Sequence, residues 1–373
     1  MSAGLRGVGT GTEADTRGHD EDALGMSAPE QGREVHGAPD AVGVSEAALR
    51  RGMQLVVAGG SLAVAVLVPF LLPRYWTFVL LAAVTTMIVG LSIVVLTGFV
   101  GQISLCQATF MGVGAYASAR LTGDAHLPFL IALPLAGLAA VPVGLLAGVP
   151  ALRLKGLYLA IATLGFGAAV QATLFSSKTL TGGFSGVALE RPTVFGISFA
   201  SDLRYYFLTL VVLLLLMAFA ANVKRGRSGR AFAAIRDGEV AAAASGISLA
   251  RYKLTAFGLS AFIAGVGGSL FGHAMLSVNT SSFDIFHSIT FVTVAIIAGV
   301  GSVGAAVFTG LMVNILPKAL DRVLPGNLLL VIFSAGMLVQ LAVAPDGIAG
   351  QMRRQQDAVL SWILRRRRVS GRD

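Results

Sequence analysis

The sequence predicts an all-α fold, a polytopic bundle of about eight to ten membrane-spanning helices. Its 373 residues are 55% hydrophobic and only 13% charged, whereas soluble domains have about 25% charged residues. Several apolar runs approach or reach the roughly 20 residues that a helix needs to cross a bilayer. Many of the 46 glycines stand inside these runs, where small residues let helices pack closely in lipid. Glycine-rich breaks also predict discontinuous or re-entrant helices.

The two ends of the chain differ from its middle in charge. Residues 1–49 contain nine Asp or Glu, three Arg and no apolar run, so we expect a disordered polar tail in the cytoplasm and no signal peptide. Residues 50–350 are expected to form the transmembrane domain, and 351–373 a basic cytoplasmic tail. Because Arg and Lys collect where a membrane protein meets the cytoplasmic leaflet, the net charge of +9 favours membrane lipid, and not nucleic acid, as the partner of these cations.

About ten segments are candidate spans. When an even number of them precedes residue 223, the cations at 153–155, 224–251 and 365–368 fall on one side of the membrane. The positive-inside rule assigns that side, with both termini, to the cytoplasm. The candidate spans are 53–72, 76–97, 105–121, 128–150, 157–175, 205–222, 254–276, 286–301, 304–323 and 327–344.

The longest hydrophilic segment inside the membrane part is 223–252. Residues 229–245 combine strong helix formers with Phe232 and Ile235, and Gly246 supplies a helix stop. We expect a short amphipathic cytoplasmic helix that docks into the groove of a partner. The alternative is an interfacial helix that lies on lipid, which its low aromatic content disfavours.

Two stretches combine glycines with polar side chains. In hydrocarbon, irregular backbone is tolerated only beside protein or a wet cavity. The stretch 97–116 is therefore either a discontinuous element beside a pathway or an ordinary turn between spans. The stretch 180–187 opens an external loop and is either a shaped rim or gate, or a glycine-rich turn. The pathway or gate candidates in them are Gly98, Gln102, Ser104, Gln107, Thr181, Gly182 and Gly183.

Residues for other chemistry are scarce. Cys106 is the single cysteine, which excludes an internal disulfide. The sequence has no metal-ligand cluster, nucleophile elbow or Walker A lysine. Ionisable residues such as His273 and Asp284 fall near expected helix ends, whereas ion-coupled transporters place them within the membrane. An ion-coupled transporter or a membrane enzyme is therefore disfavoured.

Five segments, taken in order, resemble one family. They are 98–116, 156–165, 181–186, 229–246 and 298–304. Together they are similar to the permease subunits of ABC importers for branched-chain amino acids, a family that also includes urea and short-chain amide systems. The resemblance runs from roughly residue 75 to residue 345.

The resemblance implies ATP-driven uptake of leucine, isoleucine and valine across the plasma membrane of a prokaryote. It implies three kinds of protein partner, besides the membrane lipid expected from the charge pattern: an external solute-binding protein, a second homologous permease and two cytoplasmic ATPase subunits. ATP-Mg is expected on the ATPases alone, so this chain is expected to be no enzyme and to bind no cofactor. A urea or short-chain amide permease is the alternative, and an ion-coupled transporter or channel a less favoured one.

Within the resemblance, 229–246 corresponds to the loop that couples a permease to its ATPases. Phe232 is expected to anchor the helix to the bundle. The residues expected to form the coupling surface are Ala231, Ile235, Arg236, Asp237, Glu239, Ala242 and Gly246.

Overall fold

The computed structural model describes residues 59–183, 186–194 and 196–320, all within one compact unit that begins at Met53. Helices dominate this part, which confirms the all-α prediction. Six of the described helices are long and apolar enough to cross a membrane. They are α2 with its π-helical end η1 (Arg74–Phe99), α4 (Phe129–Gly148), α5 (Gly156–Thr173), α7 (Asp202–Arg225), α10 (Leu249–Met275), and η4 with α11 (Thr280–Ala298).

Shorter elements complete the described part. The helices are Gly59–Leu71, α3 (Gln107–Gly123), η2 (Pro150–Leu152), α6 (Lys178–Thr181), α8 (Arg227–Asp237), α9 (Glu239–Ala244), α12 (Ala305–Gly310), η5 (Leu311–Ile315) and α13 (Leu316–Leu320). Two antiparallel ladders pair β1 (Val187–Ala188) with β4 (Ser277–Val278), and β2 (Thr193–Val194) with β3 (Ile197–Ser198). The expected span at 327–344 and the tails at 1–49 and 351–373 lie outside the described residues.

Helix α10 packs against α4, α3 and α2, while α2 also packs against α7 and α12. The contact between α10 and α3 requires a glycine, because a Cβ on Gly268 would lie 1.8 Å from the carbonyl oxygen of Met111. This is the close backbone approach that small residues allow in membranes. Helix α5 is the least buried of the six long helices, and Leu157, Tyr158 and Ile161 on it are exposed. An exposed apolar face of this kind suits lipid or another membrane subunit.

The backbone leaves the helical conformation at residues 101–106, just before most of the expected span 105–121. Gly101 has a φ of +75°, and α3 begins at Gln107, whose side chain contacts Ser92 within α2 and Ser260 within α10. Side-chain hydroxyls satisfy backbone N–H groups at this break: Thr163 accepts from Leu105, and Ser288 accepts from Ala108. Such pairing is what an irregular backbone inside a membrane protein requires. Residues 101–106 therefore join η1 to α3 without helix, and a role of this stretch beside a pathway stays a prediction.

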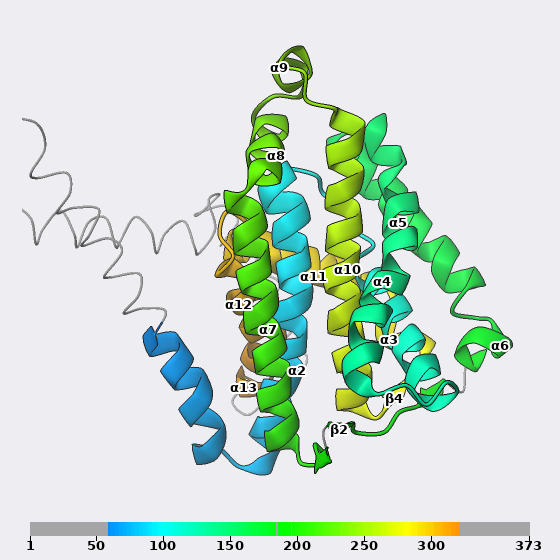
Figure 1. Ribbon diagram of the computed structural model, residues 1–373, viewed down its shortest axis with the longest axis vertical. Helices are drawn as coiled ribbons and strands as arrows, with labels where there is room; N and C mark the ends of the chain where they lie inside the picture. Colours follow the sequence, from blue (N-terminus) through cyan, green and yellow to red (C-terminus); the bar gives the residue numbers. More distant parts are fainter. Residues whose placement is uncertain (1–58, 184–185, 195, 321–373) are drawn as a thin grey trace, which may run out of the picture. The chain divides into compact units, whose positions relative to one another are not determined.

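The described loops gather at two opposite ends of the bundle. Figure 1 shows α8 and α9 at one end and α6, β2 and β4 at the other. Lys155 and Arg236, which the charge pattern assigns to the cytoplasmic side, lie at the α8–α9 end, where both line one pocket. Lys178 lies in α6, and Arg191 precedes β2, so these cations lie at the other end. The structure therefore places Lys155 and Arg236 at the opposite end of the bundle from Lys178 and Arg191.

Candidate functional site

Helices α8 and α9, joined at Gly238, form the α8–α9 element (residues 227–244). Helix α8 is amphipathic and buries Phe232 and Ile235 against the bundle, where Phe232 packs edge-on against Tyr252 with 6.0 Å between ring centroids. Gly246 follows with a φ of +79°, and its N–H bonds the carbonyl oxygen of Ala243. The element is therefore held by apolar burial and ends at Ala244, two residues before Gly246, where the sequence predicted a helix stop.

The carboxylate of Glu239 ties α9 to three other parts of the chain. One oxygen, Oε2, lies 2.8 Å from the Lys155 ammonium, before α5. The other, Oε1, lies 2.7 Å from the Lys253 ammonium in α10 and accepts from the Gln102 amide at 3.4 Å. Lys253 also donates to the carbonyl oxygen of Ala151 at 2.9 Å. Through Glu239 the α8–α9 element thus meets three parts of the chain. They are the stretch that contains Gln102, the turn before α5, and helix α10.

The two lysines favour the ionised form of the Glu239 carboxyl. Burial alone would raise the pKa of the Glu239 carboxyl, but hydrogen bonds and charge from Lys155 and Lys253 outweigh it, so the pKa lies below its ordinary value. The carboxylate is therefore ionised at neutral pH and the network is charged.

Arg236 makes a second connection, between α8 and the end of α2–η1. Its Nη1 donates to the carbonyl oxygen of Gly98 at 3.1 Å, and its Nε lies 3.1 Å from the Asp237 carboxylate. The Arg236 side chain also packs over Gly101, where an added Cβ would come 3.0 Å from its Cγ. A bulkier residue than glycine at position 101 would therefore press on Arg236.

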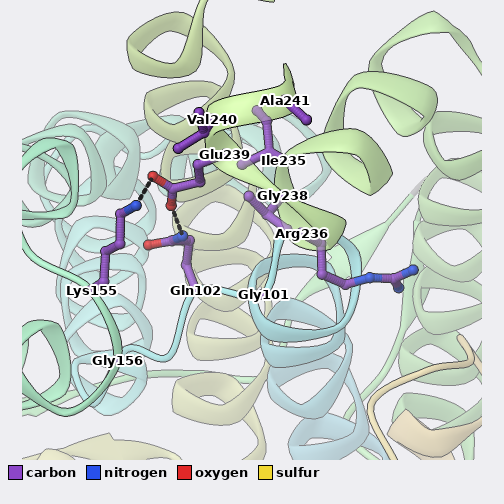
Figure 2. A pocket seen from close by; sticks show the side chains of 11 residues that line it. Gly101, Gln102, Lys155, Gly156, Ile235, Arg236, Gly238, Glu239, Val240 and Ala241 are labelled. Carbon is purple, nitrogen blue, oxygen red and sulfur yellow. Dashed lines mark hydrogen bonds and ion pairs between the residues drawn. The ribbon is translucent and has the colours of Figure 1, made fainter. Parts of the chain in front are cut away.

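A pocket of about 480 Å³ lies between the α8–α9 element and the bundle. Figure 2 shows Lys155 and Gln102 reaching the Glu239 carboxylate, while Arg236 extends in another direction. The lining residues come from three stretches that are far apart in the sequence: 100–102, 155–156 and 235–241. The pocket is open, and its lining includes the cations Lys155 and Arg236 and the anion Glu239. Its surface therefore suits a polar side chain inserted by a partner.

The structure divides the residues predicted for the coupling surface into two groups. Ala231, Ile235 and Ala242 are buried against the bundle, so they hold the element in place. Arg236 and Asp237 have exposed side chains, and the side chain of Glu239 is 14% exposed. Among the large apolar side chains of the element, Val240 is exposed, at 83%. Gly246 has open space where a side chain would stand. The role of all these residues in coupling stays a prediction.

The pathway or gate candidates do not form one site. Gly98 and Gln102 meet the α8–α9 element, whereas the buried Ser104 hydroxyl lies 3.1 Å from the sulfur of Cys106. Gln107 lies deeper, between α2 and α10.

The remaining candidates belong to the opposite end of the bundle. The Thr181 hydroxyl bonds the carbonyl oxygens of Phe175 and Ser177, and Gly182 and Gly183 follow with positive φ values. These three residues therefore form a tight turn after α6, and their role as a gate stays a prediction.

Lys155 and Lys253 are the residues of this site that the sequence did not single out. A usable signal is present for Lys253, since it stands near the start of the long apolar helix α10 and a buried lysine needs an anionic partner. No local pattern identifies Glu239 as that partner.

Comparisons with known proteins agree with this architecture. Residues 53–342 match the family model described as the branched-chain amino acid transport system / permease component. The chain is 34% identical over 275 residues to the high-affinity branched-chain amino acid transport system permease protein LivM of Salmonella typhimurium. It is 36% identical over 276 residues to the protein of the same name from Escherichia coli. Each match covers 67% of this chain and 65% of the relative, so just under two thirds of each relative is spanned. No solved structure matches the chain significantly.

Proposed function

Because the chain belongs to the branched-chain amino acid transport system permease family, we propose that it is the membrane-spanning subunit of an ATP-driven importer for leucine, isoleucine and valine. The six apolar helices provide the membrane-embedded body. In this proposal a solute-binding protein delivers the amino acid, and a second permease completes the passage. The chain itself performs no hydrolysis, and ATP-Mg is bound by two partner ATPase subunits.

The observation that carries the proposal is the placement of the α8–α9 element. It projects at one end of the bundle (Figure 1), and the contacts of Glu239 and Arg236 attach it to α10 and to the end of α2. An ATPase that moves this element would therefore move two buried helices. For such a movement to drive transport, the ATPase must interact differently with the inward- and outward-facing states.

We place the protein in the plasma membrane of a prokaryote with the α8–α9 element and both termini in the cytoplasm. The grouping of Lys155 and Arg236 at this end supports the orientation, because cations favour the cytoplasmic side.

The test is reconstitution in proteoliposomes with the partner permease, the ATPases and the binding protein, following labelled leucine with and without ATP. We expect leucine uptake that requires ATP and every subunit. Urea serves as the second labelled solute, and uptake of urea without leucine would replace the proposed substrate by that of the alternative. Transport by this chain alone, without any ATPase, would overturn the proposal and point to an ion gradient or a channel.

A further inference from the structure

The α8–α9 element is attached to the bundle through a buried lysine. Lys253 is 2% exposed and lies within α10. We propose that Lys253 is a positioning residue that makes α10 follow the movement of α9, through the Glu239 carboxylate, when the ATPases move the element. This inference rests on the proposed function and assigns the route by which movement enters the bundle.

The first support is the chemistry of a buried ammonium group. A lysine removed from water is tolerated only when its charge is paired and its protons are hydrogen-bonded. Here the Nζ atom lies 2.7 Å from Oε1 of Glu239 and 2.9 Å from the carbonyl oxygen of Ala151. Withdrawing Glu239 would leave an uncompensated buried charge, which is strongly unfavourable. α9 therefore cannot leave this position without either carrying Lys253 along or exposing its ammonium group.

The second support is the contrast with Lys155. Its side chain is 64% exposed, so solvent can replace the contact with Glu239 at little cost. The two lysines bind the same carboxylate, but only the Lys253 contact is protected from water. The structure therefore assigns the positioning role to Lys253, and to Lys155 a contact that can open and close.

The third support is the position of Glu239 relative to the outside. With both oxygens engaged inside the chain, Glu239 is not free to pair with an ATPase, whereas the next residue, Val240, is 83% exposed. A partner that contacts Val240 would move the backbone of α9 and, through Glu239, the start of α10.

Helix α10 can pass such a displacement on. Ser260, farther along α10, donates to the backbone carbonyl oxygen of Ser92 at 3.0 Å and lies 3.3 Å from the Gln107 amide nitrogen. Gly268 of α10 packs directly against the backbone of α3, so the two helices are in close contact. A shift of α10 would therefore reach the discontinuous stretch at the start of α3.

The experiment uses the complete reconstituted transporter and measures two rates on the same preparation, leucine uptake and ATP hydrolysis. The main variant is Lys253→Met, which keeps length but removes the charge. Lys253→Arg keeps the charge, and Arg251→Met removes an exposed cation two residues away on the same helix. We expect Lys253→Met to lower the number of leucines imported per ATP about tenfold, while Lys253→Arg and Arg251→Met stay within about threefold of the unsubstituted protein. Lys155→Met is expected to have a smaller effect than Lys253→Met.

A loss of uptake that Lys253→Arg rescues, with hydrolysis largely retained, supports positioning over a general structural role. An unchanged ratio of leucine to ATP in Lys253→Met, or an equal loss in Arg251→Met, overturns the inference. Failure of ATP to drive uptake in the unsubstituted complex would instead contradict the proposed function.

A second set of variants decides the question if Lys253→Met does not assemble. Glu239→Gln alone strands the Lys253 charge, whereas Glu239→Gln combined with Lys253→Met removes both charges. Recovery of assembled complex in the double variant relative to Glu239→Gln shows that the two side chains act as a pair. No recovery overturns the inference.

Discussion

The Nη1 atom of Arg236 donates a hydrogen bond of 3.1 Å to the carbonyl oxygen of Gly98. Gly98 lies in η1, the last turn of the helix that begins at Arg74. Carbonyl oxygens in the last turn of a helix lack partners within the helix, and a cation near that end is favourable. Arg236 therefore caps α2–η1 from α8, and this joins the α8–α9 element to the most buried of the six long helices.

Removing this cap is expected to weaken transport more than stability. The side chain of Arg236 is 43% exposed, so water can replace part of its hydrogen bonding, and Arg236→Ala should cost only about 1 kcal/mol of unfolding free energy. ATP-driven leucine uptake should fall about tenfold, because α8 loses its link to α2–η1. Uptake and thermal unfolding of the purified complex provide the two readings.

The matched control for this prediction is Arg230→Ala. Arg230 is an exposed arginine on the same helix, and its substitution should leave both readings close to those of the unsubstituted protein. Equal effects of the two substitutions would show that net charge matters and that the cap does not.

Gly98→Ala should destabilise the protein by a steric effect. A Cβ at this position would lie 1.9 Å from the backbone carbonyl oxygen of Val300, so the segment after α11 must move. Overpacking of a well-packed interior typically costs about 1–3 kcal/mol, and we expect a lower thermal midpoint in detergent. Gly165→Ala in α5 is the control, because nothing lies within 4 Å of the added atom. The same midpoint in both variants would contradict the close approach of Val300.

The helical boundaries near 227–246 could be predicted because they depend on neighbours in sequence. Phe232 and Ile235 recur on one face of a helix, and Gly246 permits the left-handed conformation that ends α9. The break near Gly101 was also visible, since glycines and polar residues interrupt an apolar run there. These are local signals that need no knowledge of tertiary contacts.

The ion pairs could not be predicted in the same way. Glu239 lies 14 residues before Lys253 and 84 residues after Lys155 in the chain. The three side chains meet only because α9 packs against both α10 and the turn that precedes α5. For the same reason the sequence did not predict that Ala231 and Ala242 are buried against the bundle. Their small side chains fit equally well against the bundle or against a partner, and the sequence does not distinguish the two surfaces.

Acid should release the α8–α9 element. The pKa of Glu239 is lower in the folded protein than its ordinary value of 4.5, so its contribution to stability is fully present above that value. It is lost as the pH falls through the lower folded-state pKa, when the carboxylate becomes protonated and releases Lys155 and Lys253. Amide hydrogen exchange of residues 227–246 should therefore accelerate below about pH 4.5, after correction for the intrinsic exchange rate.

Glu239→Gln supplies the control for this pH dependence, because its amide does not titrate in this range. Exchange in the variant should be faster than in the unsubstituted protein at neutral pH and should change less on acidification. An identical acid response in the two proteins would assign the release to another carboxylate.

Gln107 should contribute to stability through two buried hydrogen bonds at the start of α3. Its Oε1 accepts from the Ser92 hydroxyl at 2.9 Å and its Nε2 donates to the Ser260 hydroxyl at 3.3 Å, with only 1% of the residue exposed. Gln107→Met keeps the length of the side chain and removes both bonds, while the two hydroxyls retain the backbone carbonyl oxygens of Val89 and Ser92 as acceptors. The expected loss is therefore about 1–2 kcal/mol.

Gln107→Ala removes the same bonds and also leaves a cavity, so its loss should be larger, about 2–4 kcal/mol. Chemical denaturation of the purified protein in detergent compares the two variants, with Gln171→Ala on the exposed helix α5 as a control expected within about 0.5 kcal/mol of the unsubstituted protein. If Gln107→Met were as stable as the unsubstituted protein, the bridge between α2, α3 and α10 would contribute no net stability. The reason to keep a polar side chain at this position would then lie in transport, and the same Gln107→Met protein would show it as a raised KM for leucine in the reconstituted complex.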